Sequence, residues 1–307
     1  MKILNKIKTS FAEKREGDSQ WKRARQNRSI GGSIVMIIVI LLLGIVMLIP
    51  FYLAVINSLK PMDELFLFPP SFVVRRPTFQ SYTTLSALMR SGYVPFSRYF
   101  FNTILVAVAT TVGNVIVGSL AAYPFAKINF PGKKIMWNII MLALVFQGGV
   151  AMAFAQYLIM ASVGIVDTYW VVILPPVAST FSIFLMKQFM GEIHDDMIAS
   201  ARIDGANEWK VFWRIVMPMV KPAYLTLAIF AFQGAWQTRT DFIYTEEYKL
   251  LTNALDQLAS ISQAGQSIAR QGAAAAATVL MIIPPTAFFV MTQSNVIQTM
   301  SHSGIKG

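Results

Sequence analysis

The chain has 307 residues, of which 55% are hydrophobic and only 13% are charged, and its formal net charge is +11. A soluble domain usually has about 25% charged residues, so this composition indicates an integral membrane protein. The chain has no cysteine, and its two histidines, His194 and His302, lie far apart in sequence. This excludes disulfides, thiolate chemistry and the common cysteine and histidine metal sites.

Long apolar segments predict six transmembrane helices, because a hydrocarbon core about 30 Å thick needs roughly 20 apolar residues as helix. The first segment is too long for the apolar part of a signal peptide, and no small-residue cleavage site follows it. The third opens at Ile135 in a region that is uncharged as far as Val166, so we expect an additional short external or re-entrant helix at about 152–164. The predicted spans are 33–56, 104–126, from 135, 168–186, 219–238 and from 271.

The distribution of lysine and arginine predicts that both termini are cytoplasmic, since basic residues resist export during insertion. With the N-terminus inside, the internal segments carry 18 of the 26 basic residues and the external segments carry eight. The basic string WKRARQNR (21–28) precedes the first span, where membrane lipid or insertion explains it better than nucleic acid. The expected organisation is a basic cytoplasmic tail (1–30), a first transmembrane helix (31–56), an extracytoplasmic loop (57–97), a transmembrane core (98–293) with a charged loop at 190–222, and a cytoplasmic tail (294–307).

The charged segment Ile198 to Pro222 reads IASARIDGANEWKVFWRIVMPMVKP. Residues 195–201 suit a short helix, Asp204-Gly205 is a turn dipeptide, and apolar residues recur at helical spacing over 209–216. We expect an exposed docking helix, a turn in which Gly205 permits positive φ or close approach of another backbone, and an amphipathic helix whose pattern Pro218 and Pro222 stop. The alternative is a solvated loop with one Asp-Gly turn.

The spacing within this segment resembles the EAA loop of permease subunits of type I ABC importers. That family pattern is Glu-Ala-Ala, three residues, Gly, nine residues, Ile, one residue, Leu-Pro. Here Ala199-Ser200-Ala201 is followed at the same intervals by Gly205, Ile215 and Met217-Pro218. Together with FNTILVAVATT (101–111), AAYPFAK (121–127) and the final SGIKG, the segment is similar to the carbohydrate-uptake, maltose-permease-like branch, over nearly all the chain from Ser33 on.

This resemblance implies an all-α integral membrane protein with six transmembrane helices and the type I ABC importer (MetI-like) fold, in the bacterial cytoplasmic membrane. It implies a transport subunit rather than an enzyme, forming half of a pathway for a sugar or oligosaccharide. The implied partners are a second homologous permease subunit, two cytoplasmic ATPase subunits and an extracytoplasmic solute-binding protein. The chain would bind no cofactor, with ATP and Mg²⁺ on the ATPase subunits; its nearest phosphate-loop string, FPGKKI (130–135), lacks the first glycine.

The resemblance also implies which residues couple to the ATPase, although the acidic first position of the motif is Ala199 here. Asp195 and Asp196 lie one turn earlier on the same helical face and are candidates to supply that charge. The alternative is an acidic first turn favoured by the helix dipole. Gly304, Lys306 and Gly307 would reach between the ATPase subunits, or else form a disordered tail. The predicted coupling residues are Asp195, Asp196, Ala199, Ser200, Ala201, Asp204, Gly205 and Ala206.

Three residues are candidate contacts of the solute pathway: Gln147, Gln233 and Trp236. They offer uncharged hydrogen-bonding groups or a flat apolar ring on which a sugar stacks, and the alternative is that they join helices by hydrogen bonds. Pro175-Pro176 and Pro284-Pro285 are expected to interrupt the fourth and sixth spans, either in pathway-lining helices or as packing kinks.

Small residues at Gly118 and Ala122 and in the AAAAA run (273–277) predict faces for helix packing. An ion-coupled secondary transporter would place ionisable residues within its spans, and these spans are nearly free of charge. A membrane enzyme would need convergent acids, bases or nucleophiles, which do not occur. Within the importer class, another small solute such as an amino acid or a phosphate ester is the alternative substrate.

Overall fold

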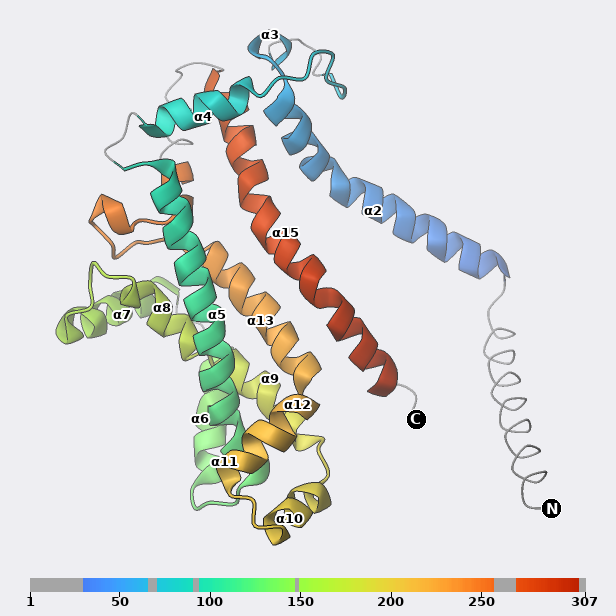
Figure 1. Cartoon of the computed structure of the whole chain (residues 1–307), viewed down its shortest axis with the longest axis vertical. Helices are drawn as coiled ribbons and strands as arrows, with labels where there is room; N and C mark the ends of the chain where they lie inside the picture. The colour runs from blue at the N-terminus through green and yellow to red at the C-terminus, as the bar shows by residue number, and fades with distance from the viewer. Residues whose placement is uncertain (1–29, 66–70, 91–93, 147–148, 257–268, 304–307) are drawn as a thin grey trace. The chain divides into compact units, whose positions relative to one another are not determined.

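The computed structural model describes residues 30–65, 71–90, 94–146, 149–256 and 269–303, which are helical over most of their length and contain no strand (Figure 1). The chain divides into two units, residues 1–56 and 57–307. The helices are α2 (Ile30–Leu59), α3 (Met62–Leu65), α4 (Gln80–Arg90), α5 (Phe96–Lys127), α6 (Lys133–Val145), α7 (Gly149–Val163), α8 (Trp170–Val177), α9 (Thr180–Gly191), α10 (Asp195–Ile203), α11 (Glu208–Val211), the π-helical turn η1 (Phe212–Val216), α12 (Met217–Met219), α13 (Lys221–Trp236), the 3-10 turn η2 (Glu246–Tyr248) and α15 (Ala269–Ser303).

Four helical segments of the described chain are long and apolar enough to cross a membrane: α2, α5, α8 with α9, and α15. They confirm the first, second, fourth and sixth predicted spans. The fifth predicted span corresponds to α13, which follows Glu208–Met219 after a bend of 80°. The third predicted span differs from the structure, because α6 has only 13 residues. A helix of this length reaches about 20 Å, less than the hydrocarbon thickness of about 30 Å.

The reason for this difference is that the uncharged region after Ile135 is not one continuous helix. Phe146, the residue after α6, has extended backbone with φ −86° and ψ 96°, and the next helix, α7, begins at Gly149. The short helix expected at 152–164 is confirmed as α7, Gly149–Val163.

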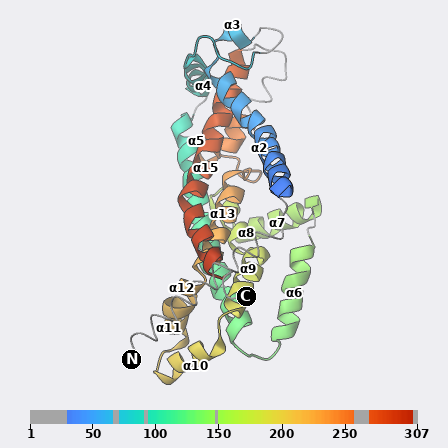
Figure 2. The same cartoon turned by 90° about the vertical axis from the view of Figure 1, so that its right-hand side faces the viewer.

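Helix α5 is the central element of the second unit and packs against α9, α13 and α8 (Figure 2). A Cβ atom added at Gly118 would lie 2.7 Å from Cβ of Ser182, so only glycine lets α5 and α9 approach this closely. Ala122, one turn further, is fully buried. The predicted small-residue face at Gly118 and Ala122 is therefore confirmed. So is the face in the alanine run, where Ala273, Ala276 and Ala277 are buried.

The first proline pair interrupts its span as expected. Helix α8 ends at Val177, directly after Pro175-Pro176, and α9 begins at Thr180. The freed carbonyl of Pro176 accepts a hydrogen bond from the Asn114 side chain of α5, and the Ser182 hydroxyl donates to the Asn114 side-chain oxygen at 2.7 Å. Neighbouring protein thus satisfies the broken backbone, as the bilayer interior requires.

The second proline pair does not interrupt its span, so that expectation is wrong. Pro284 and Pro285 lie inside the continuous helix α15. Proline lacks the N–H that would bond to the carbonyl four residues earlier, which for Pro285 is that of Met281. The indole N–H of Trp236 donates to this carbonyl at 3.0 Å and replaces the missing bond. Helix α15 continues to Ser303 because no glycine or proline occurs between Pro285 and Gly304.

The segment that follows the first span contains a buried carboxylate, Glu64. Glu64 is 4% exposed and accepts hydrogen bonds from the backbone N–H groups of Arg75 and Arg76. The ammonium group of Lys60, also buried, donates to the carbonyl of Ser71 at 2.6 Å. These two charged groups tie the start of the segment, Lys60 and Glu64, to residues 71–76.

Candidate functional site

The charged loop folds as the sequence predicts: a short helix α10, a glycine turn, and a second helical segment from Glu208 to Met219. Gly205 has φ 79°, in the left-handed region that favours glycine. No heavy atom of the described chain lies within 4 Å of a Cβ placed there. The positive φ at Gly205 is confirmed, and the space beside it is open to a partner.

The second helix continues through Pro218, the first of the two prolines expected to stop its pattern, and ends before the other, Pro222. Its N–H groups change partner before the proline: Met217 donates to Phe212, five residues earlier, in a π-helical turn. This wider turn makes room for the proline ring, which in a regular α-helix clashes with a carbonyl of the preceding turn. The helix ends at Met219, and the 80° bend follows at Val220, before Pro222.

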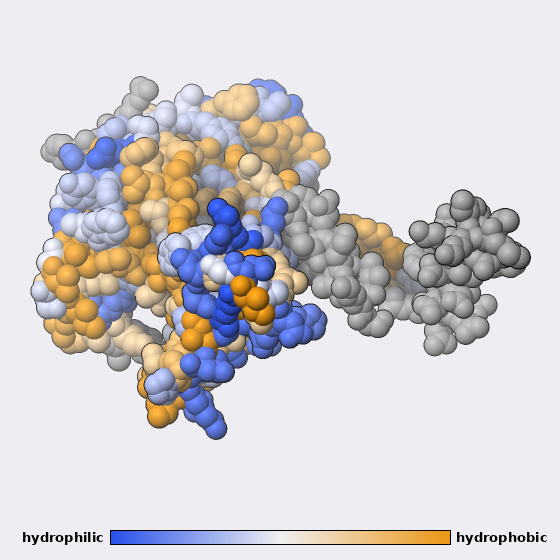
Figure 3. Space-filling view, turned by 60° about the horizontal axis from the view of Figure 1, so that its bottom comes forward, coloured by the Kyte–Doolittle hydropathy of each residue, from blue (hydrophilic) through white to orange (hydrophobic). Residues whose placement is uncertain are grey.

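Helix α10 has one buried face and one exposed face. Ile198 and Ala201 are buried in a cluster that includes Val211 and Phe212, so α10 packs on the second helix of the loop. The predicted coupling residues Asp195, Asp196, Ala199, Ser200, Asp204 and Gly205 are exposed, Ala206 is half-buried, and Ala201 belongs to the buried face. Apolar side chains accompany the exposed residues: Ile203 is 86% exposed. Figure 3 shows hydrophilic and hydrophobic surface side by side at this end of the molecule.

The first turn of α10 is held by a lysine at the end of α5. The ammonium nitrogen of Lys127 lies 2.7 Å from a carboxylate oxygen of Asp195 and also donates to the carbonyl of Ile193. The Lys127 side chain is 4% exposed, whereas that of Asp195 is 88% exposed. The hydrogen bond and positive charge of Lys127 lower the pKa of the Asp195 carboxyl. Asp196 forms no ion pair with any described residue. Of the two candidate acids, Asp195 is therefore paired within the chain and Asp196 is not.

A second polar link bridges the glycine turn. The Glu208 carboxylate accepts hydrogen bonds from Arg202 Nε at 2.7 Å and from the hydroxyl of Tyr123 at 2.6 Å. Arg202 belongs to α10, Glu208 begins α11 and Tyr123 belongs to α5, so three elements meet at one carboxylate. Sequence reasoning missed these residues as well as Lys127. The available signal was that Tyr123 and Lys127 fall within the string AAYPFAK.

The candidate pathway residues are placed only in part. Trp236 is 1% exposed, stacks on Phe232 and meets Phe100 edge to face, which gives it a packing role within this chain. Gln233 is half-buried on α13. A solute contact by either residue stays a prediction. Outside the described residues lie Gln147, Gly304, Lys306 and Gly307.

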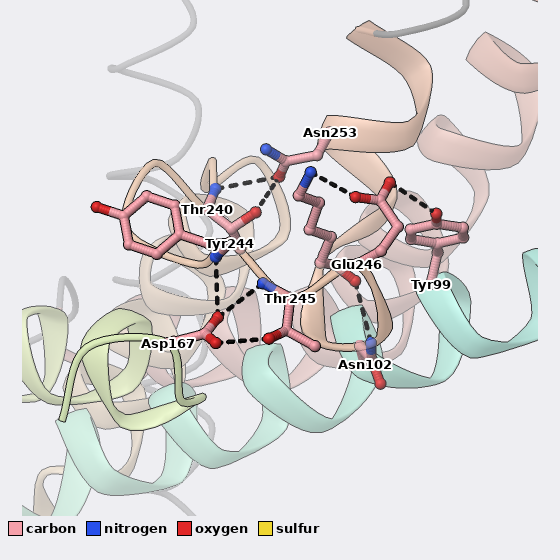
Figure 4. Close-up of polar contacts among 9 residues, drawn as sticks. Tyr99, Asn102, Asp167, Thr240, Tyr244, Thr245, Glu246 and Asn253 are labelled. Carbon is pink, nitrogen blue, oxygen red and sulfur yellow. Dashed lines mark hydrogen bonds and ion pairs between the residues drawn. The ribbon is translucent and has the colours of Figure 1, made fainter. Parts of the chain in front are cut away.

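Another polar network, away from α10, orders the loop that follows α13 (Figure 4). Asp167 has φ 63° and its carboxylate accepts three hydrogen bonds, from the N–H groups of Tyr244 and Thr245 and from the Thr245 hydroxyl. The bonds from Thr245 lower the pKa of Asp167. Nearby, the Asn102 side chain donates to the carbonyls of Glu247 and Lys249. Within the described residues, no group of three or more His, Cys, Asp or Glu side chains could hold a metal ion.

Comparisons with known proteins agree with this architecture. The chain matches the family described as "Binding-protein-dependent transport system inner membrane component" over residues 84–302. It is 31% identical over 211 residues to Protein LplC of Bacillus subtilis (strain 168). This alignment covers 67% of this chain and 66% of that protein. It is 28% identical over 258 residues to the sn-glycerol-3-phosphate transport system permease protein UgpE of Yersinia enterocolitica, which covers 83% of this chain and 91% of that protein.

A solved structure extends the likeness to three dimensions. It is a crystal structure of a bacterial ABC transporter involved in the import of the acidic polysaccharide alginate, with a TM-score of 0.73. The match covers 87% of this chain and 98% of that chain at 22% identity, a level that establishes the fold alone. The multi-pass apolar helices, the charged helix-turn-helix segment and the family match lead to one conclusion. This chain belongs to the family of binding-protein-dependent transport system inner membrane components.

Proposed function

We propose that this chain forms half of the membrane pathway of an ATP-driven ABC importer, and that α10 transmits the motion of a cytoplasmic ATPase to it. The observation that carries the proposal is the construction of α10. Its outer face presents Asp196, Ala199 and Ser200 to solvent beside the open turn at Gly205. Its inner face is buried, and polar links join it to α5. A helix that is exposed for docking yet fixed to the core passes on a rigid-body displacement.

The proposed partners are a second homologous permease, two ATPase subunits and an extracytoplasmic binding protein. The family description, which names binding-protein-dependent transport, supports the last of these. The likeness to an ABC transporter structure supports the others. The excess of lysine and arginine in the segments 1–29 and 187–221 supports cytoplasmic termini and a cytoplasmic α10. In the second unit, α10 lies apart from α7 and α8, the helices on either side of Asp167 (Figure 1).

The proposed solute is a sugar or an oligosaccharide. The structural similarity to an importer of the polysaccharide alginate and the similarity of the charged loop to carbohydrate permeases support this class. A phosphate ester is the second candidate, because the relative UgpE is a permease for sn-glycerol 3-phosphate.

The test is ATP hydrolysis by the complete complex in lipid nanodiscs, assembled from this chain with the second permease, ATPase and binding protein of the same organism. The binding protein is loaded in turn with neutral oligosaccharides, alginate oligosaccharides and sn-glycerol 3-phosphate. We expect an oligosaccharide to stimulate hydrolysis and Gly205→Val to abolish the stimulation. Stimulation by sn-glycerol 3-phosphate alone would show that the solute is a phosphate ester and not a sugar. It would not contradict the proposal that α10 couples the ATPase to the pathway. Full stimulation of the Gly205→Val complex would refute coupling through α10.

A further inference from the structure

A basic cavity is lined by residues from the end of α5, the α5–α6 turn, α6 and α9. The α5–α6 turn lies at the end of the second unit that carries α10 (Figure 2). The volume of the cavity is about 550 Å³. Among the described residues, no acidic side chain lines it, and none of its three lysines forms an ion pair with a carboxylate. The charged and aromatic residues of its lining are Lys133, Lys134, Lys187, Phe125, Phe130 and Trp137.

The positive groups of the cavity are held in place by their surroundings. The ammonium group of Lys187 lies 4.4 Å from the centre of the Trp137 ring, a cation–π contact, and Trp137 in turn stacks on Phe184. Lys133 donates to the carbonyl of Ile128 at 2.9 Å. The N-terminus of α6 opens here with Gly132 in a left-handed conformation and without a side-chain cap, which adds the positive end of a helix dipole. This concentration of positive charge favours an anionic ligand.

An apolar surface runs from the cavity along α6. Ile135, Ile139 and Leu142 are 68%, 60% and 69% exposed. Their spacing of four and three residues places them on one face of the helix. A basic cavity at one end of an exposed apolar stripe is complementary to a molecule with an anionic head and hydrocarbon chains, and basic pockets between transmembrane helices bind such headgroups.

We propose that this cavity binds the phosphate headgroup of an anionic phospholipid, such as phosphatidylglycerol, and that the acyl chains lie along the exposed face of α6. The phosphodiester is bound by Lys134 and Lys187, and Lys133 keeps the α5–α6 turn closed through Ile128. The lipid bridges α6 and α9 beside the attachment of α10. This site is independent of the transported solute.

The test is native mass spectrometry of the purified complex titrated with dioctanoyl phosphatidylglycerol, dioctanoyl phosphatidylcholine and glycerol phosphate. We expect phosphatidylglycerol to bind at least about fivefold more tightly than phosphatidylcholine. Lys134→Gln and Lys187→Gln should each weaken this binding about fivefold, the contribution of one basic residue near an anionic headgroup. Lys134→Arg and Lys187→Arg should retain it, because they keep the charge. The matched control is Lys210→Gln, an exposed lysine of α11 outside the cavity.

Three outcomes would overturn the proposal. Equal binding of phosphatidylglycerol and phosphatidylcholine would show that the lysines do not select an anionic headgroup. Competition by glycerol phosphate at the same concentration as the lipid would identify a site for a free phosphate, without a role for the α6 stripe. Loss of phosphatidylglycerol binding when the ATPase is added to the isolated permease pair would identify the cavity as a protein interface.

Discussion

The indole nitrogen of Trp236 lies 3.0 Å from the carbonyl oxygen of Met281, and this carbonyl is the one that Pro285 leaves without its helical donor. The bond joins α13 to α15 at the depth where α15 contains two consecutive prolines. Water is absent from a bilayer core, so an unpaired carbonyl there has no solvent to replace its missing donor. Trp236 therefore preserves the continuity of α15, and its ring packing and its polar atom serve the same contact.

Trp236→Phe keeps an aromatic ring in the same site and removes the N–H donor. We expect it to destabilise the protein by about 1–3 kcal/mol, the cost of leaving a buried acceptor unpaired. The measurement is thermal unfolding in detergent, together with amide exchange of α15 around Met281. Trp209→Phe is the control, because Trp209 is 61% exposed. Equal melting temperatures for the two variants would contradict the assignment.

Gly205→Val should uncouple ATP hydrolysis from transport. A β-branched residue at φ 79° costs about 1–3 kcal/mol in strain, which corresponds to roughly fivefold to more than a hundredfold in the population of the native turn. Gly205→Asn should retain most activity, since asparagine tolerates the left-handed region. Gly164→Val is the matched control: Gly164 has φ 74° and open space beside it, but it lies after α7. If both valine variants lose coupling alike, the effect is general strain.

Asp196 is the acid that we expect to contact the ATPase, since Asp195 is already bound to Lys127. Asp196→Ala should weaken ATPase binding by up to about fivefold, because it loses one exposed intermolecular charge pair of up to about 1 kcal/mol. The double change of Asp195 and Asp196 to alanine should weaken binding more than either single change. Binding is measured by titrating the ATPase onto the permease pair. If the double variant binds the ATPase with wild-type affinity, docking depends on Ile203 and other apolar groups and not on these two acids.

The Lys127–Asp195 pair should make stability depend on pH in the acid range. The pKa of Asp195 is lower in the folded protein than its unfolded value of about 3.9, so the pair stabilises above that value and its contribution is lost as pH falls through the folded pKa. We expect the wild type to melt above Asp195→Asn at pH 7, and the difference to shrink only below about pH 4, as pH falls from the unfolded pKa towards the lower folded pKa of Asp195. A difference that persists unchanged at the lowest pH would exclude this ion pair as the cause.

Asp167→Ala should release the loop that follows α13. The variant loses three hydrogen bonds and places alanine at φ 63°, where asparagine or aspartate is tolerated better. Amide exchange of Tyr244 and Thr245 should accelerate about tenfold, the equivalent of one net hydrogen bond of about 1.4 kcal/mol. Asp167→Asn keeps an acceptor oxygen and should exchange more slowly than Asp167→Ala. Unchanged exchange in Asp167→Ala would show that the loop is ordered by Asn102 instead.

Sequence reasoning predicted the elements whose signal is local. The apolar runs of α2, α5 and α15, the glycine turn at Gly205 and the close approach at Gly118 all follow from hydropathy or from the absence of a side chain. The contacts of Lys127, Tyr123 and Asn114 could not be predicted, because each joins residues more than 60 positions apart in the chain. A single sequence contains no record of such pairs.

Pro218 and the pair Pro284-Pro285 lie inside helices for related physical reasons. Proline generally ends or kinks an isolated helix. A π-helical turn accommodates the first, and a tryptophan from another helix compensates the second. A tertiary contact or a local change of helix type thus keeps each proline site helical. Neither effect can be predicted from the proline alone.

The 80° bend at Val220 makes the two helices that it joins the arms of an angled lever. Its short arm is the helix Glu208–Met219, which carries α10 through the buried Ile198 contact and the Glu208 link, and its long arm is α13. The corner is stiff, since Val220 is buried and Pro222 fixes the backbone of the next turn. A push on the short arm therefore emerges nearly at right angles along the long arm. A displacement of α10 would thereby become a tilt of α13, without any of the described residues having to unfold.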